Sequence, residues 1–251
     1  MTLLQLYEIL SFILAKQAHR QPGHADYVGD CYTWIIFDSI NKAVVAYRVG
    51  KGAWNDCREF FYDLRGRVVN RAQITSDGSA PYAPTIRAAF GYNVDCGQLQ
   101  KIYEEDERGE QASRRYSPGR VVRTEREGVF GNPEEAQIST SHVERNNLTL
   151  RMQMRRFTRP TNAFSRKLEN YKAAVGLRVA WYNLCRVHET LRTTPAMALR
   201  VTNTIWSLAD LVDAALGAVP FTTPVPPMPT TPASRGQVQL RVIRGGKATG
   251  R

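Results

Sequence analysis

LQLYEILSFIL (4–14), CYTWIIF (31–37) and AVVAYRV (43–49) are three apolar runs that follow one another at the start of the chain. The first alternates in part, and the four residues 38–41 between the second and the third form a turn signal, DSIN. We therefore expect three consecutive strands, the second and third joined as a hairpin.

An amphipathic helix and then alternating strands and helices are predicted downstream. Apolar residues recur at three- and four-residue steps, as a helix requires: Trp54, Cys57, Phe61, Leu64 and Val68. A short strand, AQITS (72–76), ends at Asp77-Gly78, and a helix around 85–90 and a strand near 92–96 follow. This order of elements is that of an RNase H-like fold. We predict an α/β protein with a mixed sheet, three antiparallel strands first and further helices at the C-terminal end.

The second half of the chain divides by composition. Residues 103–138 are polar and charged with scattered Gly and Pro, which predicts a long loop or insertion. Two helices are expected next, and the second has a core stripe made of Leu168, Tyr171, Val175, Val179 and Tyr182. After a helical stretch near 195–216, we expect a Pro-rich linker (217–233) and a basic tail (234–251), so that the folded core occupies residues 1–216.

The first of these two helices carries two different faces. Val143, Leu150, Met154 and Phe157 lie close to one of them. Another face combines one carboxylate with cations: Glu144, Leu148, Arg151 and Arg155.

Charge points to a polyanionic partner. The formal net charge is +11 and the sequence pI is about 9.7. Acids concentrate in residues 104–110, whereas bases concentrate in 145–172 and in the tail, and such segregation favours a nucleic-acid-binding face over random surface charge. The four cysteines are widely spaced and lack a C-x-x-C pair, which indicates free thiols in a reducing compartment. No apolar run is long enough to span a membrane.

Four motifs carry a resemblance to a known family: TSDG (75–78), SHVERNNLTLRM (141–152), RRFTRPTNAFSRK (155–167) and AWYNLCRVHETLRTTPAM (180–197). The chain resembles the catalytic core of bacterial insertion-sequence transposases of the DDE type over about residues 6–216. The resemblance implies two aspartates and one glutamate around a pair of Mg²⁺ or Mn²⁺ ions that cut and join DNA. It also implies element ends and target DNA as partners, a homo-oligomer, no membrane, and a cytoplasmic, nucleoid-associated location in a bacterium.

The resemblance assigns roles to named residues. Asp77 matches the second aspartate and Glu144 the glutamate, so both are expected to be catalytic metal ligands. The alternatives are a turn aspartate, and a glutamate that only stabilises the start of its helix. Arg151 lies two helical turns beyond Glu144 and resembles the family's contact to terminal DNA. Arg155, Arg156 and Arg159 are expected to contact phosphates.

The first aspartate of the family is missing. Its pattern, Asp-Glu-Ile-Trp-Ser-Phe, is replaced here by YEILSF, so Tyr7 stands at the metal-ligand position. Glu8 cannot replace it, because adjacent strand residues point to opposite faces. A phenol with a pKa near 10 is a poor Mg²⁺ ligand. Met1 lies only six residues before Tyr7, which leaves no room for the DNA-recognition region that precedes the core in the family, so we expect a truncated reading frame. A wrongly chosen start codon would produce the same truncation but would not explain Tyr7.

Two functions follow from these observations. The first is a DDE-type transposase-like protein for metal-dependent DNA strand cleavage and transfer in insertion-sequence transposition, catalytically impaired by Tyr7. The alternative is a non-catalytic DNA-binding remnant, or a competitor of intact transposase.

Overall fold

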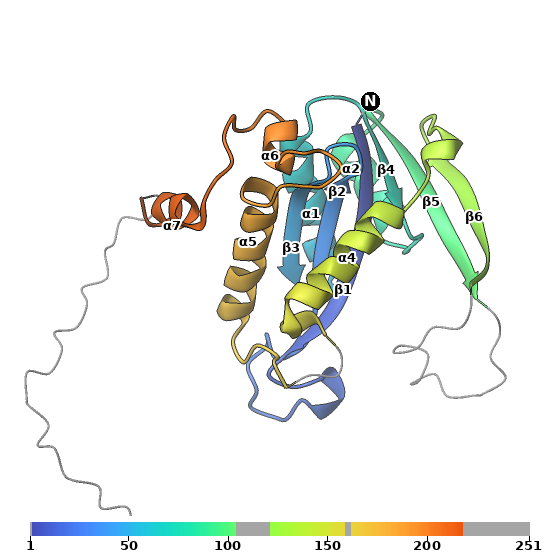
Figure 1. Ribbon diagram of the computed structural model, residues 1–251. Helices are drawn as coiled ribbons and strands as arrows, with labels where there is room; N and C mark the ends of the chain where they lie inside the picture. Colours follow the sequence, from blue (N-terminus) through green and yellow to red (C-terminus); the bar gives the residue numbers. More distant parts are fainter. Residues whose placement is uncertain (1, 104–120, 159–161, 218–251) are drawn as a thin grey trace, which may run out of the picture.

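A six-stranded mixed sheet of order β3-β2-β1-β4-β5-β6 forms the centre of the molecule (Figure 1). The computed structural model describes residues 2–103, 121–158 and 162–217. The first three strands form an antiparallel meander: β1 (Thr2–Ile13), β2 (Gly29–Asp38) and β3 (Ala43–Gly50). β4 (Ala72–Ser76) is parallel to β1, and β5 (Val94–Tyr103) is parallel to β4. This topology confirms the predicted RNase H-like fold.

The strand β1 is central and is buried from both sides, because its side chains alternate between two apolar clusters. Leu4 and Leu6 belong to the cluster under α1 (Trp54–Arg67) and α2 (Tyr82–Phe90). Ile9 and Ile13 belong to the cluster under α4 (Ser141–Gln153) and α5 (Leu168–Leu184). A period of two along a strand produces this division. The two faces of β1 are therefore two different chemical environments.

The helices largely follow their predicted apolar patterns. The stripe expected on α5 is confirmed, since Tyr171, Val175, Val179 and Tyr182 are buried and Leu168 packs against the same cluster. On α1, Cys57, Phe60, Phe61 and Leu64 are buried. Trp54 is the exception: its side chain is 60% exposed at the first residue of the helix, so its expected place in the core was wrong.

The polar stretch 103–138 contains more structure than expected. Residues 104–120 lie outside the described part, but β6 (Val121–Phe130) pairs antiparallel with β5 and forms the sheet edge, followed by the short 3-10 helix η2 (Glu135–Gln137). The prediction of a continuous loop was therefore wrong for β6. The strand was missed because most of β6 is exposed on both faces, so its sequence shows no alternation of apolar and polar residues.

Two further helix boundaries differ from expectation. α4 ends at Gln153, and the short 3-10 helix η3 (Arg155–Phe157) follows it. The stretch 195–216 contains two separate helices, α6 (Pro195–Ala198) and α7 (Leu208–Gly217). Apart from Gly217, the predicted linker and basic tail lie outside the described residues. No helix in the described part is both long and apolar enough to cross a membrane.

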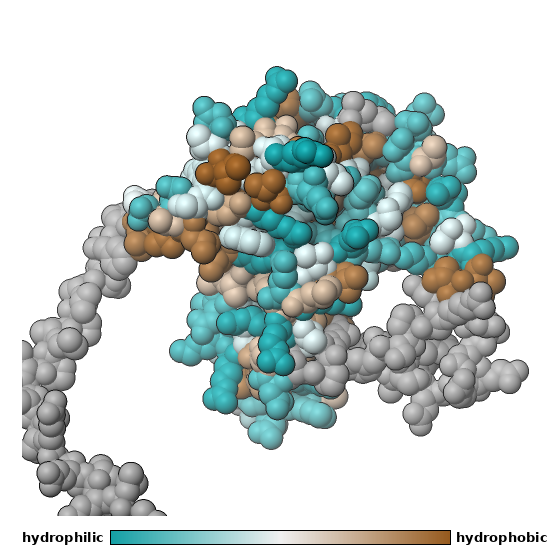
Figure 2. Space-filling view, viewed as in Figure 1, coloured by the Kyte–Doolittle hydropathy of each residue, from teal (hydrophilic) through white to brown (hydrophobic). Residues whose placement is uncertain are grey.

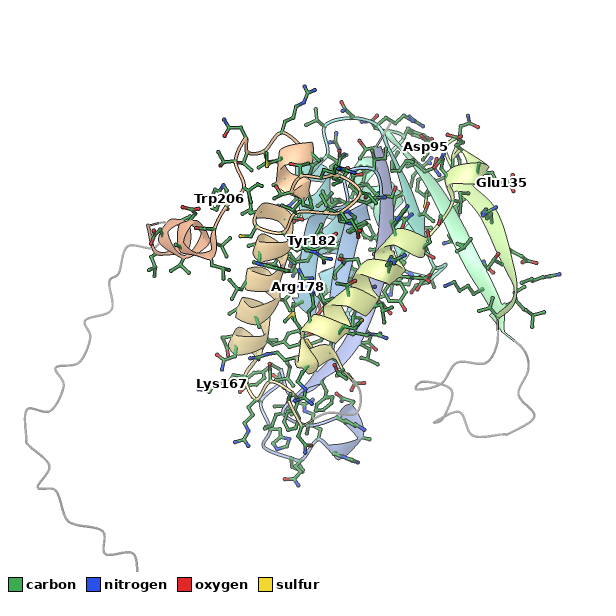
Figure 3. The ribbon with its side chains drawn as sticks, viewed as in Figure 1. Asp95, Glu135, Lys167, Arg178, Tyr182 and Trp206 are labelled. Atoms are coloured by element: carbon green, nitrogen blue, oxygen red, sulfur yellow. The ribbon has the colours of Figure 1, made fainter. Side chains whose placement is uncertain are left out.

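The side chains of the C-terminal helices include a cation between aromatic rings on α5 and exposed apolar residues on α7. The guanidinium of Arg178 lies 5.1 Å from the ring centroid of Tyr182, and both residues are labelled in Figure 3. The same guanidinium lies 4.9 Å from the ring centroid of Trp181. On α7, apolar side chains at four-residue steps remain exposed, and Figure 2 shows apolar surface gathered over this helix. They are Leu208, Val212 and Leu216.

Candidate functional site

Tyr7 and Asp77 lie side by side where β1 and β4 end their pairing. The last parallel pair in the register is Gln5 with Thr75, and Tyr7 and Asp77 each stand two residues further along. Asp77 directly follows β4, and Gly78 after it has φ +85°, a backbone conformation that glycine adopts without strain. The parallel pairing thus places the phenol and the carboxylate on neighbouring strands.

Glu144 approaches this pair from the first turn of α4, which packs across β1 and β2. The backbone N–H of the preceding residue, Val143, donates a 3.0 Å hydrogen bond to the buried side chain of Gln5. Val143 itself is fully buried, so the start of α4 is held against β1 by both polar and apolar contacts. The sequence therefore brings together the three positions that the resemblance singled out.

The electrostatics of Tyr7 reflect this arrangement. Burial raises its pKa above the ordinary value of a phenol; Arg151 opposes the rise, while Glu144 and Asp77 add to it. The phenol is therefore protonated at neutral pH. A neutral hydroxyl cannot supply the negative charge that an aspartate would bring to this position.

Asp77 is a turn residue, and together with Glu144 it forms the acidic pair of the site. Its Oδ1 accepts a 3.2 Å hydrogen bond from the backbone N–H of Ser79, as the turn alternative expects. Burial raises the pKa of its carboxyl, the Ser79 hydrogen bond opposes this, and Glu144 adds to the rise. Mutual repulsion between two nearby carboxylates is the physical cause of that last effect.

Lys101 on β5 is a member of the site that the sequence did not reveal. Its ammonium donates a 2.5 Å hydrogen bond to Oε1 of Glu144, and the same oxygen accepts a 2.6 Å hydrogen bond from the hydroxyl of Thr140. The strand was expected to stop near residue 96, whereas β5 continues to Tyr103 and carries Lys101 into place. One oxygen of the Glu144 carboxylate is thus committed to the protein's own donors.

The metal site that the resemblance implies does not fit these residues. Within the described ranges, no group of three or more His, Cys, Asp or Glu side chains is arranged to hold a metal ion. Two carboxylates remain, one of them bound by an ammonium, and the third position is a protonated phenol. Mg²⁺ and Mn²⁺ bind through oxygen ligands, and an ammonium hydrogen-bonded to a carboxylate oxygen repels a cation that approaches the same oxygen.

Glu8 cannot complete the set, as its place in the strand predicts. It lies on the opposite face of β1, where the phenol hydroxyl of Tyr82 on α2 donates a 2.7 Å hydrogen bond to its Oε2. Asp38 is also committed elsewhere: its Oδ1 accepts hydrogen bonds from the backbone N–H groups of Ile40 and Asn41 in the β2–β3 turn. Both acids therefore have structural partners of their own, although the charge of Asp77 still contributes to the raised pKa of Glu8.

The four arginines expected to contact DNA do not behave alike. Arg151 is exposed in the last turn of α4, and its charge acts on Tyr7, so it lies on the side of the acidic pair. Arg155 is exposed but belongs to η3, so the prediction that it shares a face of one helix with Glu144 was wrong. Arg156 is half-buried and donates a hydrogen bond to the Ser165 hydroxyl. Arg159 lies outside the described residues.

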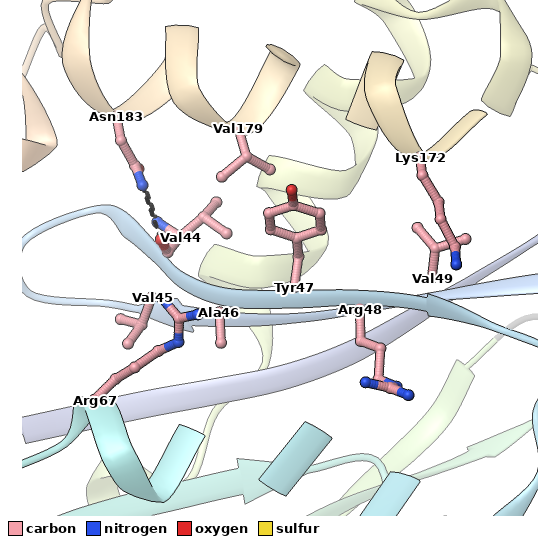
Figure 4. Close-up of a pocket in the computed structure, with 10 residues that line it drawn as sticks. All are labelled: Val44, Val45, Ala46, Tyr47, Arg48, Val49, Arg67, Lys172, Val179 and Asn183. Carbon is pink, nitrogen blue, oxygen red and sulfur yellow. Dashed lines mark hydrogen bonds between the residues drawn. The ribbon is translucent and has the colours of Figure 1, made fainter. Parts of the chain in front are cut away.

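A separate hollow of about 480 Å³ lies beside the edge strand β3 and is lined by neither Asp77 nor Glu144 (Figure 4). The side-chain amide of Asn183 on α5 bonds both the N–H of Val44, at 3.0 Å, and its carbonyl, at 2.8 Å. Tyr47 and Lys172 line the same hollow. β2 separates this hollow from β1, so it is distinct from the site around Tyr7.

Comparison with known proteins adds little to this geometry. No protein-family model matches the chain, and no curated protein matches it. Among solved structures, the cryo-EM structure of a piggyBac transposase synaptic complex with hairpin DNA is similar, with a TM-score of 0.34 and 13% identity. The match covers 88% of this chain and 58% of that one. This is a weak structural similarity to a transposase, and at that score it does not assign a function.

Proposed function

We propose that this chain is a DDE-type transposase-like protein that binds DNA and is impaired in metal-dependent strand cleavage and transfer. The observation that carries the proposal is the set of side chains at the end of the β1–β4 pairing. Tyr7 stands beside Asp77 and Glu144, and Lys101 is hydrogen-bonded to Glu144. The set has the layout of a three-carboxylate site with one carboxylate replaced and another neutralised.

The motifs of residues 141–197 support the transposase-like part of this proposal. They occupy α4, η3 and α5, which cover the face of the sheet that carries Tyr7. The resemblance assigns the glutamate of the site to α4, and Glu144 stands there in the first turn. The resemblance and the observed topology are therefore mutually consistent.

The charge of the chain supports DNA as the partner. The net charge is +11, and Arg145 and Arg151 are exposed on α4 without a carboxylate partner within 4 Å among the described residues. Exposed cations of this kind neutralise phosphates and release counterions, which makes binding strongly dependent on salt. A homo-oligomer and both kinds of DNA, element ends and target, belong to the same proposal.

Residual cleavage is the second candidate, because one specific observation favours it. The charge of Glu144 acts on the carboxyl of Asp77, and within the described residues the hydrogen bonds that Asp77 accepts come from backbone N–H groups near it. Two carboxylates are sufficient to hold one divalent ion weakly. This candidate predicts metal-dependent nicking of DNA, and the non-catalytic candidate predicts none.

The test uses the full chain with a fluorescent DNA duplex and a supercoiled plasmid. Fluorescence anisotropy should show binding that weakens steeply with salt. The plasmid should remain supercoiled with Mg²⁺ or Mn²⁺. Nicking that is lost in both Asp77→Asn and Glu144→Gln would instead establish the cleaving protein, and absence of DNA binding at low salt would overturn the proposal altogether.

Paired variants locate the impairment. Tyr7→Asp restores a third carboxylate, and Tyr7→Asp combined with Lys101→Met also removes the competing ammonium. Nicking gained in the double variant would show that these two positions cause the loss. If the double variant binds DNA and remains inert, the non-catalytic remnant or competitor is the better description.

A further inference from the structure

A cluster of five basic side chains lies at the other end of α4 from Arg151, and three separate segments contribute to it. Lys42 comes from the turn before β3, His142 and Arg145 from the start of α4, and Arg186 and His188 from the loop after α5. The ammonium of Lys42 lies 3.4 Å from both ring nitrogens of His142. We refer to these five residues as the Lys42 cluster.

The members of the Lys42 cluster act on one another electrostatically. Burial lowers the pKa of His188, and the charges of Arg186 and Lys42 lower it further, with Glu189 opposing them. Arg145 and His188 both act on His142. The groups therefore share one patch of the surface, although they are far apart in sequence.

The cluster lacks a carboxylate partner of its own. No ion pair within 4 Å involves any of its members in the parts of the chain that the structure describes. The acid nearest to Lys42 in sequence is Asp38, whose charge acts on Lys42. Asp38 is 1% exposed, however, and its two oxygens accept three hydrogen bonds from Ile40 and Asn41, while the Lys42 ammonium donates to the carbonyl of Ser39. Like charges gathered in this way repel one another unless an anion joins them.

We infer that the Lys42 cluster is a binding site for a phosphate group. At neutral pH, Lys42, Arg145 and Arg186 supply three positive charges, and guanidinium forks match phosphate oxygens in geometry. The two imidazoles can donate N–H groups without carrying a charge. α4 has 13 residues and presents its N-terminal, partially positive end at the same place.

Two sources of phosphate fit this chemistry: the backbone of DNA and a free phosphate or phosphomonoester. Arg151 lies nine positions after His142, so the two are about 14 Å apart along the helix axis and leave opposite sides of α4. Only this DNA source rests on the proposed function, because binding of a free phosphate does not require it.

The test measures binding of inorganic phosphate by isothermal titration calorimetry at fixed pH and ionic strength. The variants are Arg145→Gln, Arg186→Gln and the double variant. Arg58→Gln, an exposed cation on α1 against the opposite face of the sheet, is the matched control. Thermal unfolding confirms that each variant is folded, and Arg145 is the safest position because its side chain is exposed.

We expect the double variant to bind phosphate at least about tenfold more weakly than the unaltered chain, and Arg58→Gln to stay within about twofold. In a parallel titration with a DNA duplex, each lost phosphate contact should lower the slope of log affinity against log salt by about one. If the double variant loses affinity for both phosphate and DNA, the DNA backbone is the source; if it loses affinity for phosphate alone, the source is a free phosphate. The inference is overturned if the double variant binds both ligands as Arg58→Gln does, or if the unaltered chain binds neither phosphate nor DNA.

Discussion

Glu8 and Tyr82 form a 2.7 Å hydrogen bond under α2, on the face of β1 opposite to Tyr7. Burial is the main reason that the pKa of Glu8 is raised, and the Tyr82 hydrogen bond opposes it. The folded protein therefore holds a proton on Glu8 more tightly than the unfolded chain does. The two residues have a measurable effect on stability as the pH changes.

The first prediction concerns that pH dependence. Since the folded pKa is raised, Glu8 costs stability as the pH rises through the unfolded value and then the folded one. Glu8→Gln removes the charge and keeps an oxygen that can accept from Tyr82. Its stability relative to the unaltered chain should therefore increase as the pH rises above about 4, measured by urea unfolding. Glu169→Gln, at the exposed start of α5, is the control; an equal change in both variants would contradict the prediction.

The second prediction concerns Lys101 and Glu144. Their side chains are 28% and 33% exposed, so the pair is partly shielded from solvent. A double-mutant cycle with Lys101→Met and Glu144→Gln, followed by urea unfolding, should give a coupling free energy of about 0.5–1 kcal/mol. The more exposed pair Asp63–Arg67 on α1 is the control and should give about 0.3–0.5 kcal/mol. Zero coupling would mean that the ammonium does not hold Glu144 in solution.

The third prediction concerns the close approach of β5 to the segment before α4. A Cβ added to Gly97 would lie 2.7 Å from two carbon atoms of Ile138, a fully buried side chain. Gly97→Ala should therefore destabilise the fold by about 1–3 kcal/mol in thermal or urea unfolding. Gly66→Ala is the matched control, because no atom within 4 Å meets its added Cβ and α1 is helical there. It should stabilise by about 0.5–1 kcal/mol, and equal effects would refute the steric argument.

The fourth prediction concerns a buried hydroxyl network. The hydroxyl of Tyr171 accepts a 2.7 Å hydrogen bond from Ser11 and lies 2.9 Å from the hydroxyl of Thr33. Tyr171→Phe leaves the fully buried Thr33 hydroxyl without this partner and should cost about 1–3 kcal/mol of unfolding free energy. Tyr62→Phe, at a side chain that is 53% exposed, should change stability by less than about 0.5 kcal/mol. A loss no larger than that of the control would exclude the network as a source of stability.

The fold could be predicted from the sequence where a buried face produces a periodic pattern of apolar residues. The apolar runs of the first three strands and the stripe on α5 predicted their elements correctly, because one or both faces of each are buried. β6 escaped detection for the opposite reason. Its residues are exposed on both sides, and its stability as a strand comes from backbone pairing with β5, which leaves no pattern in the side chains.

The candidate site was only half readable. Tyr7, Asp77 and Glu144 were found through a motif resemblance, and the parallel register of β1 and β4 explains why distant residues meet. Lys101 was missed because its role depends on how far β5 continues, and no local signal marks that length. The partners of Arg156 were likewise unpredictable, since its hydrogen bond to Ser165 depends on the path of the chain after η3.

The alternation of β1 has a consequence for the history of the acidic pair. The chain still owns three acids near this strand end, but Glu8 is held on the far side of it. A shift of β1 by a single residue would bring Glu8 to the face that Tyr7 now occupies, and it would also turn Leu4, Leu6 and Ile9 away from the clusters that bury them. The packing of these apolar side chains therefore fixes which residue of β1 faces Asp77 and Glu144. A register shift cannot supply the missing negative charge, and only a substitution of Tyr7 itself can.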